Sequence, residues 1–152
     1  MELIKKNTEK HRAVYIGEGH YHKVWHGAPE GWTSKHAQLL EKFMPGYVIQ
    51  YGPNWIDFEI LEGTPASEMD HTDEFIKRVY KFCLDSIEYT APYVHGDWTL
   101  SNIIVNGDKM QLCDWDNIGI YDKEEVMKKL DSDLESAFGE RYRKVIYDTA
   151  VV

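Results

Sequence analysis

The stretch H-G-D-W-T-L-S-N at residues 95–102, followed by L-C-D-W-D at residues 112–116, decides how this chain folds and what it can do. Asn102 follows Asp97 by five positions, and Asp114 follows Asn102 by twelve. Carboxylate and amide oxygens are the ligands that a hard cation such as Mg²⁺ prefers, and a carboxylate can also accept a proton from an attacking hydroxyl. The three residues therefore form a candidate site for chemistry on phosphate groups.

A tight β-hairpin is expected between these two stretches. Residues 103–105 and 110–112 read as short strands around Asn106-Gly107, a pair that favours two-residue hairpin turns. The hairpin would fold Asp114 back toward Asn102, so that distant residues become close in space. The alternative is that these Asp and Asn residues only serve the turns in which such residues gather.

The segment His95-Gly96-Asp97 with Asn102 resembles the catalytic loop H-x-D-x-x-x-x-N of protein kinases. The glycine after the histidine, and D-W-D at residues 114–116 in place of D-F-G, resemble the aminoglycoside phosphotransferase and choline kinase branch of that superfamily. The resemblance implies an α+β, bilobal protein kinase-like fold. It also implies Asp97 as catalytic base, Asn102 and Asp114 as magnesium ligands, and His95 as a structural residue of the loop.

The remaining sequence fits two lobes. Five runs with strand character share the first part: residues 2–6, 12–16, 21–25, 47–51 and 55–61. We expect one helix among them at residues 34–43, capped by Thr33 or Ser34. The segment E-G-T-P at residues 62–65 is the expected linker, so residues 1–62 form a small β-rich N-lobe and residues 63–152 a shortened, mainly helical C-lobe.

Two helices are expected in the second part. Thr72 can cap a helix with acidic residues in its first turn, which ends before Pro92. A second helix is expected from about Lys123 to Phe138, because apolar residues recur there at four-residue steps. The pattern at residues 140–147 does not decide between helix and loop.

The resemblance also places the nucleotide. Lys23 would steady the ATP phosphates, and the alternative is a solvated lysine on an edge strand. Backbone groups near Glu59 and Leu61 would bind the adenine, and the alternative is an ordinary strand that leads into a loop. The implied cofactors are ATP and Mg²⁺.

Several positions depart from the family pattern. The loop at residues 7–10 has no glycine to cradle phosphates, although Lys10 could contact them. The acidic partner expected for Lys23 aligns with His36, and Glu41 lies one turn away. Only 36 residues follow Asp116, whereas family members usually carry more helices there to shape the acceptor site.

Composition limits the class of protein. The 152 residues are 43% hydrophobic and 28% charged, with a formal net charge of -9, so we expect a globular chain that binds neither nucleic acid nor a membrane. This charge would suit a cationic small substrate. Two cysteines and a polar N-terminus favour a cytoplasmic location. A lobe this small is compatible with a homo-oligomer, in which a partner would cover apolar surface.

The resulting expectation is a small-molecule kinase that transfers the γ-phosphoryl group of ATP to a hydroxyl acceptor. Three alternatives stay open. The first is a pseudokinase or nucleotide-binding regulatory module with little or no transfer, favoured by the departures above. The second is a small protein kinase, although Gly96 replaces the arginine that would sense a phosphorylated activation loop and no A-P-E motif follows. The third is an interaction domain that binds no nucleotide.

Overall fold

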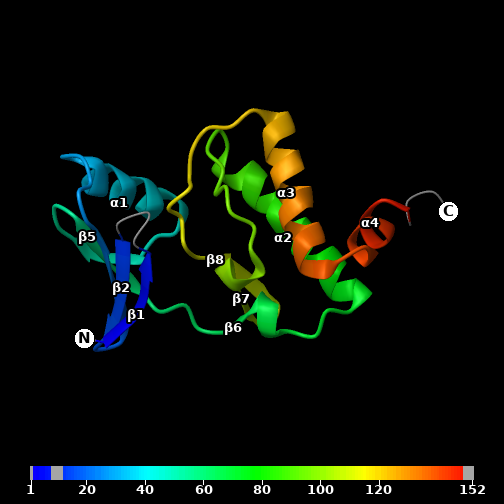
Figure 1. Ribbon diagram of the computed structural model, residues 1–152, viewed down its shortest axis with the longest axis horizontal. Helices are drawn as coiled ribbons and strands as arrows, with labels where there is room; N and C mark the ends of the chain where they lie inside the picture. Colours follow the sequence, from blue (N-terminus) through cyan, green and yellow to red (C-terminus); the bar gives the residue numbers. More distant parts are fainter. Residues whose placement is uncertain (1, 8–11, 149–152) are drawn as a thin grey trace. The chain divides into compact units, whose positions relative to one another are not determined.

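The structure is a computed structural model that describes residues 2–7 and 12–148. It is a mixed α+β protein, with a sheet-rich N-terminal part followed by a part that carries most of the helices (Figure 1). The chain divides into two compact units, Met1–Ile60 and Leu61–Val152. No helix in the described part of the chain is both long and apolar enough to cross a membrane.

The first unit is built on a five-stranded antiparallel sheet with the order β1-β2-β3-β5-β4. Its strands are β1 (Glu2–Asn7), β2 (Arg12–Gly17), β3 (His20–Trp25), β4 (Val48–Tyr51) and β5 (Trp55–Glu59). A tight turn joins β2 to β3, and Glu18 and Gly19 both have positive φ there. Since β3 pairs with β2 on one side and β5 on the other, it is an interior strand.

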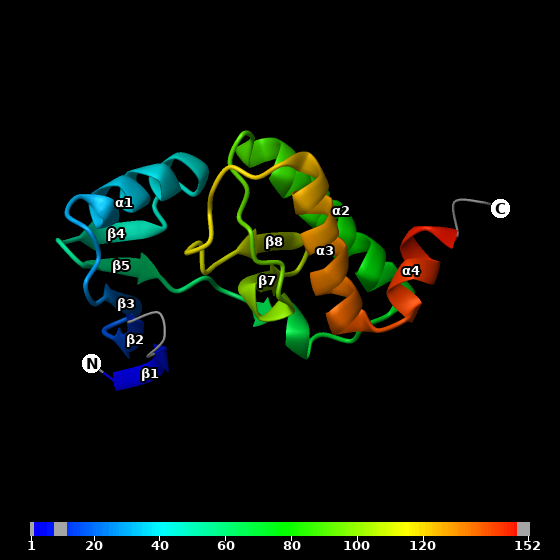
Figure 2. The ribbon, with the colours of Figure 1, turned by 45° about the horizontal axis from the view of Figure 1, so that its top comes forward.

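The single helix of this unit, α1 (Trp32–Phe43), begins earlier than expected. Gly31 is its N-cap with φ of 82°, a left-handed conformation that glycine adopts without strain. The predicted caps, Thr33 and Ser34, are therefore wrong, and Thr33 is instead fully buried. Figure 2 shows α1 lying along β4 and β5, where Leu40 is also fully buried.

The boundary region differs from its expected form. Strand β5 ends at Glu59 rather than at Leu61. The segment expected as a linker is partly a strand, because β6 (Thr64–Pro65) pairs with β7 in the second unit. This pairing joins Thr64 to Val105, and such a non-local partner is not visible in the local sequence pattern.

The second unit contains the predicted hairpin. Strands β7 (Ile103–Asn106) and β8 (Lys109–Leu112) pair antiparallel, and β6 completes a three-stranded sheet in the order β6-β7-β8. The two-residue turn is Gly107-Asp108 rather than the expected Asn106-Gly107, because Asn106 still pairs with Lys109 at the end of β7. Gly107 takes a positive φ of 61° as the first turn residue. Two short 3₁₀ turns, η1 (Ala66–Glu68) and η2 (Leu100–Asn102), follow β6 and precede β7.

Three helices complete this unit: α2 (Asp73–Thr90), α3 (Lys123–Phe138) and α4 (Arg141–Ile146). Figure 1 shows α2 and α3 side by side, with α4 packed against both. The predicted cap is confirmed, because the Thr72 hydroxyl accepts a hydrogen bond from the Phe75 N–H; such a cap stabilises a helix by about 1 kcal/mol. The predicted apolar stripe of α3 is buried along its length, at Val126, Leu130, Leu134 and Phe138.

Candidate functional site

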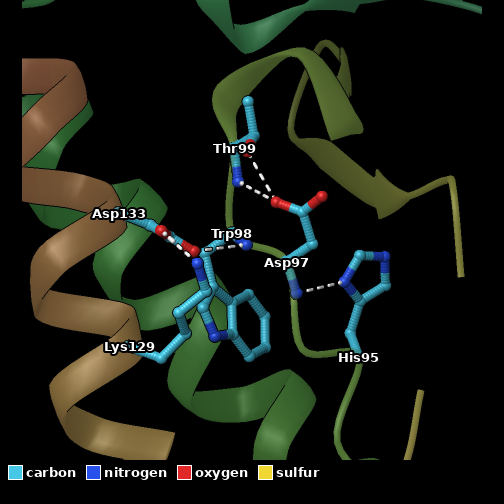
Figure 3. Close-up of polar contacts among 6 residues, drawn as sticks. All are labelled: His95, Asp97, Trp98, Thr99, Lys129 and Asp133. Atoms are coloured by element: carbon cyan, nitrogen blue, oxygen red, sulfur yellow. Dashed lines mark hydrogen bonds and ion pairs between the residues drawn. The ribbon is translucent and has the colours of Figure 1, made fainter. Parts of the chain in front are cut away.

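The ring of His95 forms hydrogen bonds that fix the loop that carries Asp97. This ring is fully buried, and its Nδ1 accepts the backbone N–H of Asp97 at 3.1 Å. Its Nε2 lies 2.8 Å from the carbonyl oxygen of Cys113, to which it donates. One neutral tautomer makes both bonds, so His95 links the residue before Asp114 to the backbone of Asp97. Figure 3 shows the bond between the Asp97 N–H and the His95 ring. The predicted structural role of His95 agrees with this geometry.

Burial lowers the pKa of His95 below its ordinary value of about 6.5, because desolvation disfavours the charged ring. The Cys113 carbonyl acts in the opposite direction, as do the carboxylates of Asp97, Asp114 and Asp116, but they do not overcome the burial. The ring is therefore neutral in the folded protein near neutral pH, as its two hydrogen bonds require.

The free energy of unfolding is expected to decrease as pH falls from about 6.5 toward the lowered pKa of His95. In this window the unfolded chain binds a proton at the ring and the folded chain does not, whereas above it the contribution to stability is complete. Urea titrations at several pH values give the free energy of unfolding as a function of pH. The slope of this free energy against pH should be steeper for the wild type than for His95→Phe. The exposed His26→Phe is the control and should keep the wild-type slope. Equal slopes for wild type and His95→Phe would contradict this role of His95.

The Asp97 carboxylate is fixed through one oxygen and open at the other. Its Oδ1 accepts the Thr99 hydroxyl at 2.5 Å and the Thr99 backbone N–H at 3.3 Å (Figure 3). No hydrogen bond to Oδ2 is found among the described residues, and the side chain is half-buried. Oδ2 is therefore free to accept a proton from an incoming hydroxyl, while the bonds from Thr99 fix its direction.

A residue that the sequence did not single out, Asp133 of α3, holds the same loop from the other side. Its Oδ2 accepts the backbone N–H of Trp98 at 3.0 Å, and its Oδ1 lies 3.0 Å from the Lys129 ammonium (Figure 3). Asp133 stands three positions after Leu130 in the buried stripe of α3. No local signal distinguishes Asp133 from the other acidic residues of α3, because its partner lies 35 positions away in the sequence.

Asn102 and Asp114 flank the open end of the predicted hairpin. The N–H of Cys113 donates to the Asn102 carbonyl at 2.8 Å, so the ladder continues one residue beyond the strands and brings the two segments side by side. Asn102 is 9% exposed. Asp114 has a φ of 55°, a left-handed conformation that costs energy outside glycine and is typical of functional sites.

These two residues fit a magnesium ion only as a partial ligand set. Asn102 offers an amide oxygen and Asp114 a carboxylate, and both are ligands of the kind that Mg²⁺ takes. The described residues contain no group of three or more His, Cys, Asp or Glu side chains placed to hold a metal ion. Mg²⁺ usually binds through one or two protein groups together with phosphate and water oxygens. The pair therefore suits an ion that arrives with a nucleotide.

Gly96 has to be a glycine for two physical reasons. Its φ is 85°, and a Cβ placed there would lie 2.7 Å from the carbonyl oxygen of Asn117. The close approach is maintained by an antiparallel bridge between Val94 and Gly119, with backbone bonds of 2.8 and 3.1 Å. The segment after Asp114 is thus packed directly on the loop that carries Asp97.

In the first unit, Lys23 is buried rather than solvated, with 7% of its surface exposed. It lies on the interior strand β3, and its ammonium is 5.3 Å from the centre of the Trp25 ring. The alternative of a solvated edge lysine is therefore wrong. A buried ammonium is unusual for lysine.

The two residues considered for the position of the acidic partner of Lys23 make other contacts in the first unit. The ring of His36 stacks on Trp32, with centroids 4.7 Å apart, and meets the edge of Trp25. The carboxylate of Glu41 is exposed and accepts the backbone N–H of Gly46 at 3.1 Å, so it closes the end of α1. The departure from the family pattern seen in the sequence thus persists in the structure.

The residues expected to bind adenine lie at the end of β5 and just beyond it. The N–H of Glu59 donates to the Tyr47 carbonyl at 2.8 Å and is not available to a nucleotide. Leu61 is half-buried and lies outside the strand. Glu59 and Lys23 belong to the first unit, whereas Leu61 and the cluster of Asp97, Asn102 and Asp114 belong to the second. Of the glycine-free loop, residues 8–10, including Lys10, lie outside the described residues.

Comparison with known proteins gives a likeness of fold. No protein-family model and no curated protein matches the chain. A 2.2 Å crystal structure of WbdD is similar over 87% of this chain, with a TM-score of 0.56 and 15% identity. A crystal structure of monomeric WbdD is similar over 95% of this chain, with a TM-score of 0.62 and 16% identity. The matched regions are 36% and 41% of those chains, so this chain spans well under half of their length.

Proposed function

We propose that the protein is an ATP- and Mg²⁺-dependent phosphotransferase with a bilobal protein kinase-like fold, and that it transfers the γ-phosphoryl group to a hydroxyl of a small molecule. The observation that supports the proposal most directly is the hydrogen bonding of the Asp97 carboxylate. One of its carboxylate oxygens is held by Thr99 and the other is open, on a loop bonded through His95 to the segment of Asp114. Asn102 lies at the same end of the hairpin.

The roles of the residues follow from their chemistry. Bound Mg²⁺ would neutralise the phosphate charge that phosphoryl transfer moves between oxygens. Asn102 and Asp114 would hold this ion through one amide and one carboxylate oxygen. Asp97 would orient the acceptor hydroxyl and take its proton as the bond from phosphorus to the acceptor oxygen forms and the bond to the β-phosphate oxygen breaks. ADP is then the leaving group, and Asp97 returns the proton to solvent.

Lys23, from the first unit, would contact the α- and β-phosphates, and backbone groups near Leu61 would face the adenine. Lys23 has the chemistry for this, because it is a buried cation on an interior strand. The Glu59 N–H is already used by Tyr47, so the adenine contact would fall on other backbone groups of this segment.

ADP formation tests the proposal. It should require Mg²⁺ and rise when a hydroxyl acceptor is added. Asn102→Ala should lower it by at least about tenfold at limiting Mg²⁺, because charge stabilisation by a metal is worth several kcal/mol. Asn106→Ala, which removes the same amide from the exposed end of β7, is the matched control and should keep the wild-type rate. ADP formation that is independent of Mg²⁺, or equal in both variants, would contradict the assigned ligand.

The second candidate is a nucleotide-binding regulatory module with little transfer. A specific observation favours it: the position aligned with the acidic partner of Lys23 holds His36, whose ring stacks on Trp32, and the carboxylate of the nearby Glu41 accepts the backbone N–H of Gly46. This candidate predicts Mg²⁺-dependent nucleotide binding without ADP formation, and the two measurements together separate it from the enzyme.

A further inference from the structure

A pocket in the second unit lies beside the loop that carries the candidate base, with Thr99, Leu100 and Ser101 of that loop in its lining. Its volume is about 370 Å³, and it is open to solvent. Thr99 forms part of its wall, and the hydroxyl of Thr99 is the group that lies 2.5 Å from Asp97 Oδ1. A molecule in this pocket would therefore contact Thr99, whose hydroxyl is bonded to the carboxylate that we propose as the base.

Hydroxyl groups dominate the polar lining of this pocket. Ser67 after β6, Thr99 and Ser101 in the loop, and Ser136 on α3 all contribute to it. The hydroxyls of Ser67, Ser101 and Ser136 make no hydrogen bond to any other described residue. Each can both donate and accept, so the lining is suited to a ligand whose own groups do both.

The lining carries no uncompensated charge. It contains no lysine or arginine, which an anionic ligand would need. Its one carboxylate, Asp133, is occupied at both oxygens, by the Trp98 N–H and by the Lys129 ammonium. The pocket therefore lacks the free carboxylate that a cationic ligand would need, in contrast to the preference suggested by the net charge of -9.

We infer that this pocket is the acceptor subsite and that it takes an uncharged, hydroxyl-rich molecule of the size of a single sugar or a small polyol. The volume lies at the lower end of the range for small-molecule sites, roughly 300–1,000 Å³. The ring of His71, held by a 3.0 Å bond to the Ala66 carbonyl, adds a flat surface to a wall otherwise rich in hydroxyls. The inference rests on the proposed function, because it identifies the substrate class of that site.

A direct binding experiment tests the inference without nucleotide. Saturation-transfer NMR on the intact chain would use glucose, glycerol and myo-inositol as neutral probes, choline as the cationic probe and glucose 6-phosphate as the anionic probe. At least one neutral probe should bind, and its affinity should exceed those of the two charged probes. Binding of a charged probe alone, or of no neutral probe at millimolar concentration, would overturn the inference.

A pair of variants on α3 locates the binding. Ala137 is an exposed residue of this pocket, and Ala137→Trp should fill it and weaken neutral-probe binding by at least about tenfold. Glu125 is an exposed residue of a different pocket of about 260 Å³, lined also by Gly96 and Trp98, and Glu125→Trp should leave the binding unchanged. The reverse result, or loss in neither variant, would assign the acceptor elsewhere. Ser136→Phe serves the same purpose if Ala137→Trp fails to fold.

These experiments distinguish a failure of the acceptor inference from a failure of the phosphotransferase proposal. If neutral probes bind at this pocket but Mg²⁺–ATP does not bind the protein, the phosphotransferase proposal fails and the pocket remains a polyol site. If Mg²⁺–ATP binds and supports ADP formation but Ala137→Trp leaves neutral-probe binding intact, the phosphotransferase proposal stands and the acceptor inference fails.

Discussion

Asp97→Ala is expected to lower phosphoryl transfer by about 10²- to 10⁴-fold, the usual contribution of a positioned general base. Oδ2 is the open oxygen of a carboxylate whose other oxygen is held by Thr99, so the substitution removes the proton acceptor and leaves the surrounding loop bonds of His95 and Trp98 in place. Binding of Mg²⁺–ATP should be largely unchanged, because Asp97 is not one of the proposed metal ligands.

The measurement is ADP formation at saturating Mg²⁺–ATP, with nucleotide binding determined on the same preparations. Asp108→Ala is the matched control, since Asp108 is an exposed carboxylate in the turn of the β7–β8 hairpin and its loss changes the net charge equally. Transfer that survives Asp97→Ala would show that another group is the base. Loss of nucleotide binding in Asp97→Ala would show that Asp97 contributes to the metal site instead.

Trp98→Ala is expected to lower the free energy of unfolding by about 3–5 kcal/mol, the range for removing a large aromatic side chain from a core. Trp98 is 0% exposed and is the largest fully buried side chain in the described residues. Its position in the sequence directly after Asp97 means that the core of the second unit anchors the candidate base.

Trp98→Phe is the informative comparison. The indole Nε1 is buried and has no hydrogen-bond partner in the described structure, so phenylalanine loses volume but also removes an unsatisfied donor. We expect Trp98→Phe to cost much less than Trp98→Ala in urea unfolding followed by circular dichroism. A loss below about 1 kcal/mol for Trp98→Ala would be outside the range for a core aromatic residue and would contradict this role.

Local sequence signals predicted the elements whose cause is local. The β7–β8 hairpin, the Thr72 cap and the apolar stripe of α3 are all present, because each depends on residues within one or two turns of chain. The hairpin turn lies one residue later than expected, at Gly107-Asp108. The start of α1 at Trp32 was not predicted, and the reason for this is also local in the sequence. Gly31 supplies a left-handed N-cap, whereas the more common Ser and Thr signals lay further along.

Features that depend on distant residues were not visible in the pattern. The order β1-β2-β3-β5-β4 places Lys23 inside the sheet, and no local signal reveals which strands flank β3. The pairing of β6 with β7 likewise turned an expected linker into a strand. Asp133 was missed because its partner, the Trp98 N–H, lies 35 positions away. The motif predicted Asp97, Asn102 and Asp114 as site residues, but the groups that hydrogen-bond to Asp97 could be identified only from the structure.

The central claim is a Mg²⁺–nucleotide site at Asn102 and Asp114, and the thermal unfolding midpoint with ATP, with and without Mg²⁺, tests it most directly. A ligand that binds only the folded protein stabilises it by about 2.7 kcal/mol at a hundredfold excess over its Kd, which corresponds to several degrees for a chain of this size. We expect this rise for wild type only when Mg²⁺ is present, and its loss in Asp114→Ala. No rise at millimolar ATP with Mg²⁺, or the same rise in Asp114→Ala, would show that these residues do not form a Mg²⁺–nucleotide site.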